Sequence, residues 1–414
     1  MKTRQVAHII IEADTPLKVG SNASDFLQDN PIQKDWNGLP MILGTSIAGV
    51  LRKDFNENLV DDIFGKDNGS KVIFSNALLL DENMQVNEGL LQKKTPFLQL
   101  FDILPIREHT SMTDKGVVKE HAKFDEEVLY KGTRFKFSIE MIDNEQSFEQ
   151  ILDLLSIASF RLGGGSSKGF GKLKILSIKT GIFNLASYEN YTSTLNHQLS
   201  IEYKVQSKAS QTHTKYTLSL TPDDFFIFGS SFGDDEADST PIYEKVVDYD
   251  SKKLSDKQLL LPASSIKGAI AHRTTFHYNS LVGNTIEDKN GFYTIEAIFG
   301  SAKDSENKTG KKGKVIFCDC FKKDKKETKT FDHVSIDRFT GGALDGALFQ
   351  EKTIAQKDMW EIEILLSKDI EGNELQAFEN TLTDITTGML PFGGMTTKGH
   401  GFFTGELLRD GEKI

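Results

Sequence analysis

The sequence predicts an α+β protein made of two copies of one domain in tandem. Its 414 residues are too many for one average domain and enough for two. Four sequence blocks recur in the same order in the two halves, and each half alternates strand-like and helix-like segments in the same order. Together these observations indicate a duplicated domain whose copies differ by loop insertions.

The four recurring blocks are the main evidence for duplication. They pair residues 43–51 with 262–270, 63–74 with 298–317, 124–135 with 349–360, and 163–171 with 393–401. The second pair ends in an identical Lys-Val-Ile-Phe, and the fourth shares the pattern Gly-Gly-x-[Ser/Thr]-[Ser/Thr]-Lys-Gly-x-Gly. One matched block could arise by chance, whereas four in order indicate a repeat.

Each half predicts the same order of elements. An opening strand leads through a polar loop to a helix, for which Ser46 and Ser265 are the expected N-caps. The Lys-Val-Ile-Phe strand follows. The remaining elements are a strand ending at Phe137 or Ile362, a helix at residues 148–160 or 376–389, the glycine-rich block and a final strand. Strand-helix-strand twice over is the ferredoxin-like (RRM-like) pattern, here with inserted loops.

The boundary between the copies is expected in the polar residues 187–200, which have little apolar content. We place a first domain at residues 1–190, a linker at 191–200 and a second domain at 201–414. Residues 201–205 alternate as a strand does and are expected to open the second domain, as residues 7–12 open the first.

Composition narrows the class of protein. No apolar run approaches the roughly 20 residues that span a bilayer, and the start does not resemble a signal peptide, so we expect a cytoplasmic protein without membrane contact. Cys318 and Cys320 are too close for a zinc ligand set or a disulfide framework and are expected to be small buried groups of a strand. The net charge of −11 argues against a stand-alone, nonspecific nucleic-acid binder. It fits a subunit that shares its ligand with neighbours.

The glycine-rich blocks are candidate anion sites. Glycines permit positive φ, and successive N–H groups can hold a phosphate, with Lys168 or Lys398 beside it. The order of residues fits neither a Walker loop nor a dinucleotide fingerprint. The alternative is a tight helix-to-strand connection. The recurrence of the lysine in both copies favours contact with phosphate.

These blocks resemble the RAMP superfamily, and specifically the backbone subunits of type III CRISPR effector complexes. The family's segment [Ile/Leu]-Pro-Gly-Ser-Ser-[Leu/Ile]-Lys-Gly-x-[Leu/Ile]-Arg is similar to residues 43–52 and 261–268, with Ala48 in place of the lysine and Ala271 in place of the arginine. Its Asp-Arg-x-Thr-Gly-x-Ala stretch and following Leu-Phe-x-x-Glu resemble residues 337–351, and residues 119–127 are a degenerate version. A two-copy chain is most like the tandem subunits of type III-D-like systems.

The resemblance implies two tandem RAMP domains that bind a guide RNA, its complementary target RNA and other effector subunits. The expected RNA-binding residues are Ser46, Arg52, Gly164, Gly165, Lys168, Gly169, Ser264, Ser265, Lys267, Arg338, Gly394, Lys398 and Gly399.

In target-cleaving members of this family, an Asp in the loop after the first strand cuts the target RNA with a divalent metal. Residues 29–32 resemble the local pattern Asp-Ser-Pro-[Val/Ile], and residues 238–242 do so with one extra residue before the proline. The resemblance therefore implies Asp29 and Asp238 as catalytic residues and candidate metal ligands, with Mg²⁺ or another divalent metal as cofactor. A lone carboxylate can hold Mg²⁺ through water or help remove the proton of an attacking RNA 2′-OH.

Two alternatives stay open at this point. The chain could be a noncatalytic RNA-binding scaffold of the same architecture, with the two aspartates as ordinary loop residues. It could instead be a guide-processing ribonuclease that uses histidine chemistry. The candidate histidines are His121, His272, His277 and His400. The Lys-rich residues 308–329 are either a solvated face or an extension of an RNA groove, and residues 91–118 and 301–329 are candidate protruding loops.

Overall fold

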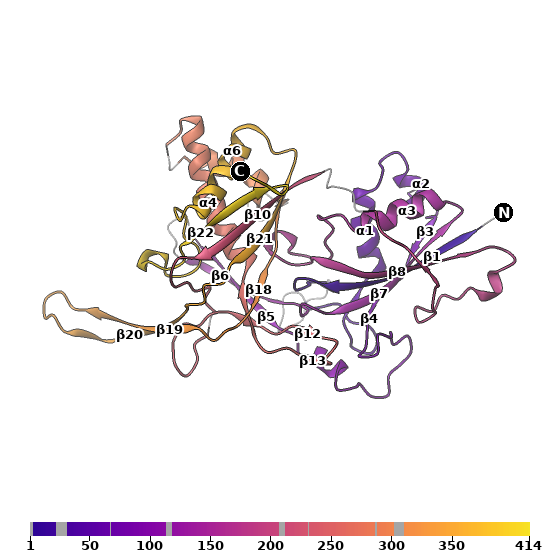
Figure 1. The fold of residues 1–414 in the computed structure, drawn as a ribbon, viewed down its shortest axis with the longest axis horizontal. Coiled ribbons are helices and arrows are strands. Elements are labelled where there is room, and N and C mark those ends of the chain that lie inside the picture. The colour runs from indigo at the N-terminus through magenta and orange to yellow at the C-terminus, as the bar shows by residue number, and fades with distance from the viewer. Residues whose placement is uncertain are drawn as a thin grey trace.

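Each half of the chain forms a ferredoxin-like domain in the computed structural model. The structure describes residues 3–21, 31–66, 68–112, 118–206, 212–230, 232–285, 288–301 and 310–414. The two domains lie side by side, with the N-terminus at one end of the molecule and a long hairpin projecting at the other (Figure 1). The predicted α+β fold with two copies of one domain is confirmed.

The first domain has the strand order of the ferredoxin-like pattern. Its elements are β1 (Arg4–Ala13), α1 (Gly44–Asp54), β3 (Val72–Phe74), β7 (Arg134–Ile142), α3 (Glu145–Leu154) and β8 (Leu173–Phe183). The strands pair antiparallel in the order β3-β7-β1-β8. β1 is central because its β-branched run suits a fully paired strand, and Ile9 and Ile11 are completely buried.

The second domain repeats this order. Its elements are β10 (His213–Pro222), α4 (Ala263–Val282), β17 (Val315–Phe317), β21 (Trp360–Ser367), α6 (Gly372–Thr386) and β22 (Phe403–Arg409). The strands pair in the order β17-β21-β10-β22, also antiparallel. Each domain has its own apolar core, centred on Phe135 and Phe137 in the first and on Trp360 and Phe378 in the second.

Shorter elements decorate both domains. In the first they are β2 (Met41–Ile42), α2 (Val60–Phe64), β4 (Ala77–Leu79) and β9 (Ile201–Glu202). In the second half of the chain they are β11 (Tyr243–Glu244), β12 (Val247–Asp248), β13 (Lys253–Leu254), β14 (Gln258–Leu261), α5 (Lys289–Phe299), β15 (Gly300–Ser301), β16 (Lys311–Lys312), β18 (Cys320–Lys323) and β23 (Glu412–Lys413). The hairpin of β12 and β13 packs on the first domain, where Val247 and Tyr249 enter the core.

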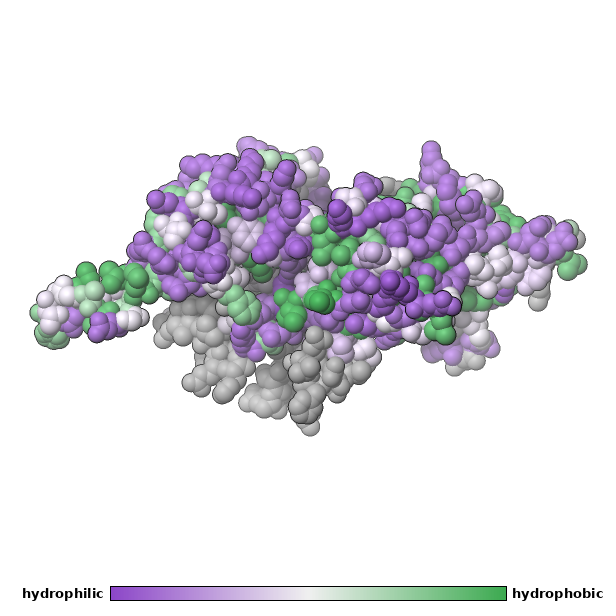
Figure 2. Space-filling view, turned by 90° about the horizontal axis from the view of Figure 1, so that it is seen from below, coloured by the Kyte–Doolittle hydropathy of each residue, from purple (hydrophilic) through white to green (hydrophobic). Residues whose placement is uncertain are grey.

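A long hairpin is inserted at the matching place in each domain. The first hairpin is β5 (Ile106–Met112) with β6 (Val118–Glu127), and the second is β19 (Thr328–Ile336) with β20 (Ala343–Ile354). The second hairpin projects into solvent and carries much of the apolar surface seen at that end (Figures 1 and 2). The insertions were expected at residues 91–118 and 301–329, so the second protrusion starts later in the chain than predicted.

The helices begin earlier than predicted, because a distant side chain caps them. α1 starts at Gly44 and α4 at Ala263, so Ser46 and Ser265 lie within the first turn and neither is the N-cap. The N–H of Gly44 donates to Asn76 Oδ1 at 2.9 Å, and the N–H of Ala263 donates to Asp319 Oδ1 at 2.8 Å. Asn76 and Asp319 occupy equivalent positions, five residues after the lysine of each Lys-Val-Ile-Phe block (76 − 71 and 319 − 314).

The segment expected to open the second domain belongs to the first sheet instead. β9 pairs with β8, and the N–H of Tyr203 donates to the carbonyl of Ile178 at 3.0 Å. The opening strand of the second sheet is β10. Part of the predicted linker also packs on the first domain: Leu195 and Leu199 are buried, and the Asn196 amide bonds both backbone groups of Val86.

Other boundaries shift because local caps and pairing override the hydrophobic pattern. β7 and β21 each continue past the predicted ends at Phe137 and Ile362. α3 starts at Glu145 because the Asn144 side chain accepts from the N–H of Ser147 at 3.0 Å. α6 ends at Thr386, just before Gly388 at φ 73°.

The two cysteines are free thiols, as expected of structural groups. Cys318 is buried and Cys320 partly so. Burial raises the pKa of both thiols above the ordinary value, so neither is activated as a nucleophile. None of the helices within the described ranges is long and apolar enough to cross a membrane.

We predict that Asn76, not Ser46, caps α1. Asn76→Ala removes the acceptor of the Gly44 N–H and should lower the free energy of unfolding by about 1 kcal/mol, measured by urea titration of the full chain. Ser46→Ala is the matched control and should leave the midpoint unchanged or slightly higher, since alanine is the better helix former. Equal destabilisation by both substitutions would contradict the assignment.

Candidate nucleic-acid interface

The two glycine-rich loops have the same backbone conformation. Each leads into the last strand of its sheet through a single 3₁₀ turn, Ser166–Lys168 or Thr396–Lys398. Left-handed residues flank each turn, Gly165 and Gly169 in the first loop. The N–H of Gly164 donates to the Lys18 carbonyl at 2.8 Å, and that of Gly394 to the Ile227 carbonyl at 2.7 Å. These two N–H groups therefore hold the loops in place and are not free to bind an anion.

The first glycine-rich loop is covered by the second domain. A Cβ on Gly169 would lie 2.3 Å from Asp319 Oδ1 and 2.7 Å from Ala263 Cβ, so only glycine fits there. Arg107 of the first hairpin lies over the Phe170 ring of the same loop, 5.0 Å from its centroid. The close approach brings the start of α4 directly onto the loop.

A lysine-lined pocket of about 360 Å³ opens at this contact. Lys168 enters it from the first domain, and Ser264 and Lys267 enter it from the first turns of α4. Lys267 Nζ donates to Ser167 Oγ at 3.3 Å, across the domain boundary. Burial, together with the neighbouring Lys168, lowers the pKa of Lys267 to about 8. Glu296 lines the same pocket, and Lys168 Nζ lies 3.6 Å from Glu126 Oε1. Lys267, with Lys168 beside it, is the group of this pocket that can attract an anion such as a phosphate.

The second glycine-rich loop has no such cover. Lys398 and Gly399 are exposed, and a Cβ on Gly399 would meet no described atom within 4 Å. Gly394 packs on Ile227. The loop thus presents to solvent the surface that its counterpart presents to α4.

The other predicted RNA-binding residues lie outside the pocket. Arg52 donates to the Gly65 carbonyl at 2.8 Å and to Asp61 at 2.7 Å, which ties α1 to α2. Ser46 is half-exposed on α1, and Ser265 is exposed on α4. Arg338 is exposed at the tip of the second hairpin, beside Phe339, which is 98% exposed.

Asp238 lies on an exposed loop beside the stem of the second hairpin. Its Oδ2 accepts from the N–H of Gln350 at 2.8 Å. Backbone bridges close this loop between Gly229 and Pro241, and the equivalent loop of the first domain between Gly20 and Ile32. Both spans have the same length (241 − 229 = 32 − 20 = 12), and each aspartate comes three residues before the closing bridge.

Asp29 itself falls outside the described residues, so its catalytic role stays a prediction. Within the described ranges, no group of three His, Cys, Asp or Glu side chains is arranged to hold a metal ion.

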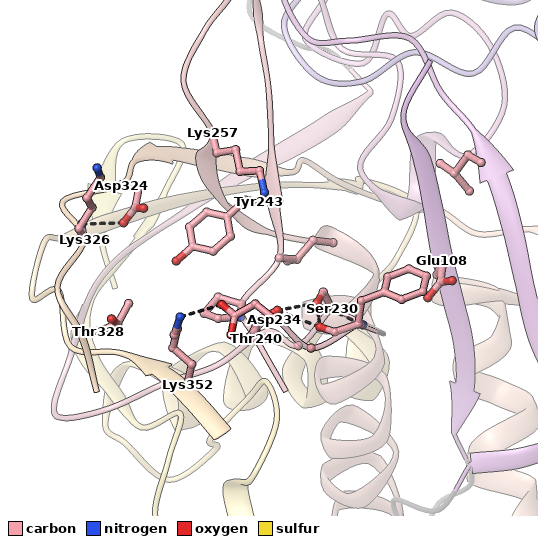
Figure 3. Close-up of a pocket in the computed structure, with 16 residues that line it drawn as sticks. Glu108, Ser230, Asp234, Thr240, Tyr243, Lys257, Asp324, Lys326, Thr328 and Lys352 are labelled. Atoms are coloured by element: carbon pink, nitrogen blue, oxygen red, sulfur yellow. Dashed lines mark hydrogen bonds and ion pairs between the residues drawn. The ribbon is translucent and has the colours of Figure 1, made fainter. Parts of the chain in front are cut away.

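A larger pocket, about 570 Å³, separates the Asp238 loop from the first hairpin. Figure 3 shows Glu108 of β5 facing the stretch that carries Ser230, Asp234 and Thr240. Lys257, Lys326 and Lys352 line the same pocket, and Lys352 is paired with Asp234 at 2.7 Å. The hairpin of one domain and the acidic loop of the next therefore form one surface.

The stem of each hairpin holds a histidine that the sequence did not reveal, beside the Phe-x-Glu of the third recurring block. His109 faces Glu126 and stacks on Phe124 in the first stem. In the second stem, His333 faces Glu351 and stacks on Phe349 in the same way. The two histidines match only in the hairpin register, opposite Phe124 and Phe349, because their spacings to the glutamates differ by one residue (126 − 109 = 17, 351 − 333 = 18).

The histidines named by the guide-processing hypothesis lie in different environments. His277 is paired with Asp384 at 2.7 Å and His400 with Glu351 at 2.9 Å, while His272 is exposed. The side chain of His121 lies outside the described residues.

A family model for the RAMP superfamily matches residues 10–174 and 245–404, one region in each domain. The chain belongs to the RAMP superfamily. Among solved structures, a chain of the type III-B Cmr-β complex bound to cognate target RNA is similar, at 18% identity and a TM-score of 0.33. The match covers 43% of this chain and 61% of that one. A comparison with curated proteins finds no match. The assignment of the chain to the RAMP superfamily rests on the family match and not on the structural likeness.

We predict that RNA affinity falls as pH rises through about 8. Below that pH the Lys267 ammonium is charged. Above it Lys267 is neutral and must take up a proton before it can pair with a phosphate, so binding weakens. Lys267→Met should weaken binding about tenfold at pH 7, the loss of one charge-assisted contact. Fluorescence anisotropy with a labelled single-stranded RNA between pH 6.5 and 9.5 measures the pH dependence of the affinity and the effect of the substitution. Lys257→Met, in the other pocket, is the matched control. An identical pH profile in wild type and Lys267→Met would contradict the assignment.

Proposed function

We propose that this RAMP protein is a backbone subunit of a type III CRISPR effector complex, which binds guide RNA and cleaves complementary target RNA. The observation that carries the proposal is the lysine-lined pocket built by both domains. Lys168 of one copy and Lys267 of the next converge where the first glycine-rich loop meets α4. A polyanion that follows the domains in order would pass this point.

The charge distribution supports a ligand shared along the complex. The chain is acidic overall, at −11, whereas Lys168 and Lys267, with Glu296, line its inter-domain pocket. Local charge and not the total decides where a phosphate backbone binds. Contacts from lysines and loop residues to phosphates position an RNA without reading its bases, which suits a subunit that accepts any guide.

The exposed second glycine-rich loop supports further subunits as partners. It repeats the conformation of the first loop, and Lys398 and Gly399 are uncovered. A neighbouring subunit that docked as α4 docks on the first loop would complete a second pocket of the same kind around Lys398. The complex would then continue the guide-RNA path beyond this chain.

Target cleavage is the more specific part of the proposal. Asp238 lies on an exposed loop, where only Oδ2 accepts a hydrogen bond among the described residues. The remaining oxygen is compatible with Mg²⁺, which takes one or two carboxylates and completes its shell with water and substrate phosphates. Such a metal would stabilise the charge that develops on the cleaved phosphate. Asp238 would hold the metal or accept the proton of the 2′-OH, and Asp29 would do the same in the first domain.

A noncatalytic scaffold is the second candidate function. It is favoured by the hydrogen bond that Asp238 receives from the N–H of Gln350, which gives this carboxylate a structural role in closing its loop on β20. A scaffold of this kind would still bind RNA in the lysine-lined pocket, and another subunit would cut the target.

We predict two cuts in the target RNA, each lost with one aspartate. Purify the chain with its complex and guide RNA, add end-labelled complementary RNA with Mg²⁺, and map the products. Asp238→Ala should remove one cut by at least a hundredfold and Asp29→Ala the other, since each domain acts separately. Asp235→Ala, three residues before Asp238, is the control and should leave both cuts.

EDTA should stop both cuts, and cutting that survived chelation would instead indicate histidine chemistry. Guide RNA bound normally, with both cuts unchanged in the double variant, would leave the scaffold function and overturn the enzyme.

A further inference from the structure

Ion pairs join the two domains within the chain. Arg107 meets Asp319 at 2.5 Å and Glu244 at 2.6 Å, and Lys172 Nζ lies 3.2 Å from Glu363 Oε1. The first domain contributes the cations from the side that carries its glycine-rich loop, which we call the loop face. The second domain contributes the carboxylates from the side where α4 begins, which we call the cap face. Each domain has both faces, so one face of each kind lies outside this inner contact.

The outer loop face, on the second domain, has phenylalanines in the places of the two cations. Phe331 takes the place of Arg107, as the registers of the two hairpins show. Phe402 takes the place of Lys172, because the carbonyl of each accepts the N–H of the aspartate that follows the first strand of its sheet. Both phenylalanines are partly buried. This face therefore offers aromatic rings where the inner one offers charges.

The outer cap face, on the first domain, lacks the matching carboxylates. Asn76 takes the place of Asp319 and is exposed. Ser138 takes the place of Glu363, since each precedes the residue that pairs with the end of the Lys-Val-Ile-Phe strand. The two outer faces have thus exchanged an ion pair for neutral groups on both sides of the same contact.

One carboxylate stays on the outer cap face. Asp35 stands in the place of Glu244, each three residues after the bridge that closes its loop. The Oδ1 of Asp35 accepts the N–H groups of Asn37 and Leu39 at 2.8 and 2.9 Å, so its own turn stabilises this charge. The next residue, Trp36, is 69% exposed. An aromatic ring therefore lies on this face as well.

The inner contact is reinforced by the β12–β13 hairpin, which the outer loop face could not receive. A Cβ on Gly132 of the first domain would lie 2.2 Å from the Val247 carbonyl oxygen, so the hairpin needs glycine at this point. The counterpart of Gly132 in the second domain is Lys357, since each lies three residues after an equivalent β-bridge, at Leu129 and Ile354. A side chain at Lys357 would obstruct such a hairpin.

The outer cap face has only a short turn where the second domain has this hairpin. The N–H of Met41 donates to the Gln33 carbonyl, as the N–H of Leu260 donates to that of Ile242. The spans between these partners are 8 and 18 residues (41 − 33 and 260 − 242). An outer loop face that cannot receive the hairpin is thus matched by an outer cap face that has none.

We propose that the outer loop face of one chain docks on the outer cap face of a second chain of the same sequence, in the arrangement that joins the two domains. Phe331 and Phe402 would lie against Asn76 and Ser138, with Trp36 beside Phe331. Neutral groups can be buried together there, whereas an arginine or carboxylate of the inner kind would be buried without its partner. The inner faces are already occupied, so the contact has one direction and joins chains end to end.

This inference names the partner of the second glycine-rich loop and in that respect rests on the proposed function. Ala48 stands in the place of Lys267. The pocket at this joint would therefore hold Lys398 without the counterpart of Lys267, and the contact itself needs no RNA. Tests on the RNA-free chain are thus independent of RNA binding.

Sedimentation velocity of the RNA-free full chain tests the association. The average sedimentation coefficient should rise with protein concentration, and Trp36→Ala should weaken the association about tenfold, as expected for an aromatic contact residue. Leu185→Ala is the matched control, because Leu185 is 84% exposed and follows the far end of β8. A wild-type chain that stays monomeric, or equal effects of the two substitutions, would overturn the inference.

Rebuilding the inner ion pair between chains tests the pairing of the faces. Phe331→Arg places a cation against Asn76 and should weaken the association by at least about tenfold. Asn76→Asp in the same chain supplies the partner and keeps a cap, as Asp319 does for α4, so the double variant should associate again. Thermal melts followed by circular dichroism verify that each variant is folded. A double variant that associates no better than Phe331→Arg would contradict the pairing.

Cross-linking separates this inference from the proposed function. Thr397→Cys and Ala48→Cys, made in separate chains, match Ser167 and Lys267, which touch at the inner joint. A short bismaleimide should link the two variants when they are mixed, and Thr397→Cys mixed with Leu185→Cys is the control. In the purified effector complex, links from residue 397 to a different subunit alone would overturn the inference and leave the proposed function. End-to-end association without RNA binding would overturn the proposed function and leave the inference.

Discussion

One buried arginine links the two domains, in addition to Val247 and Tyr249, which pack in the core of the first domain. Arg107 is 2% exposed and meets Asp319 at 2.5 Å and Glu244 at 2.6 Å, both in the second domain. A buried charge is tolerated only where its partners are present in good geometry, so the cluster fixes how the domains meet. The same Asp319 carboxylate caps α4, and Arg107 also lies over Phe170 of the first glycine-rich loop. The hairpin, the loop and the helix are thus joined at one point.

This joint decides what the chain can offer to an RNA. Capping of α4 by Asp319 sets the position of Lys267 against Lys168, and the first hairpin is held beside the loop that carries Asp238. The equivalent residue of the first domain, the uncharged Asn76, caps α1. Both copies therefore share the cap, and the one at the contact between the domains carries a charge.

The fold could be predicted from the sequence because its signals are local and repeated. Blocks such as Lys-Val-Ile-Phe and the glycine-rich pattern mark the same element twice. Three of the residues predicted to bind RNA, Lys168, Ser264 and Lys267, line one pocket. Features set by distant contacts could not be predicted. Serine at the start of a helix suggested a cap, but side chains 32 and 56 residues away serve instead. The alternation of residues 201–205 does not reveal which sheet they join, and His109 and His333 match only once the hairpin register is known.

Differential scanning calorimetry of Arg107→Met tests most directly whether the arginine joins the domains. The wild-type chain should unfold in one cooperative transition. The variant leaves Asp319 and Glu244 buried without a cation, at a cost of about 3–5 kcal/mol, and should unfold at a clearly lower temperature. Adding Asp319→Asn, which keeps a cap of the Asn76 kind, together with Glu244→Gln should restore part of the lost stability. A single transition at the wild-type temperature in Arg107→Met would contradict this role of the arginine.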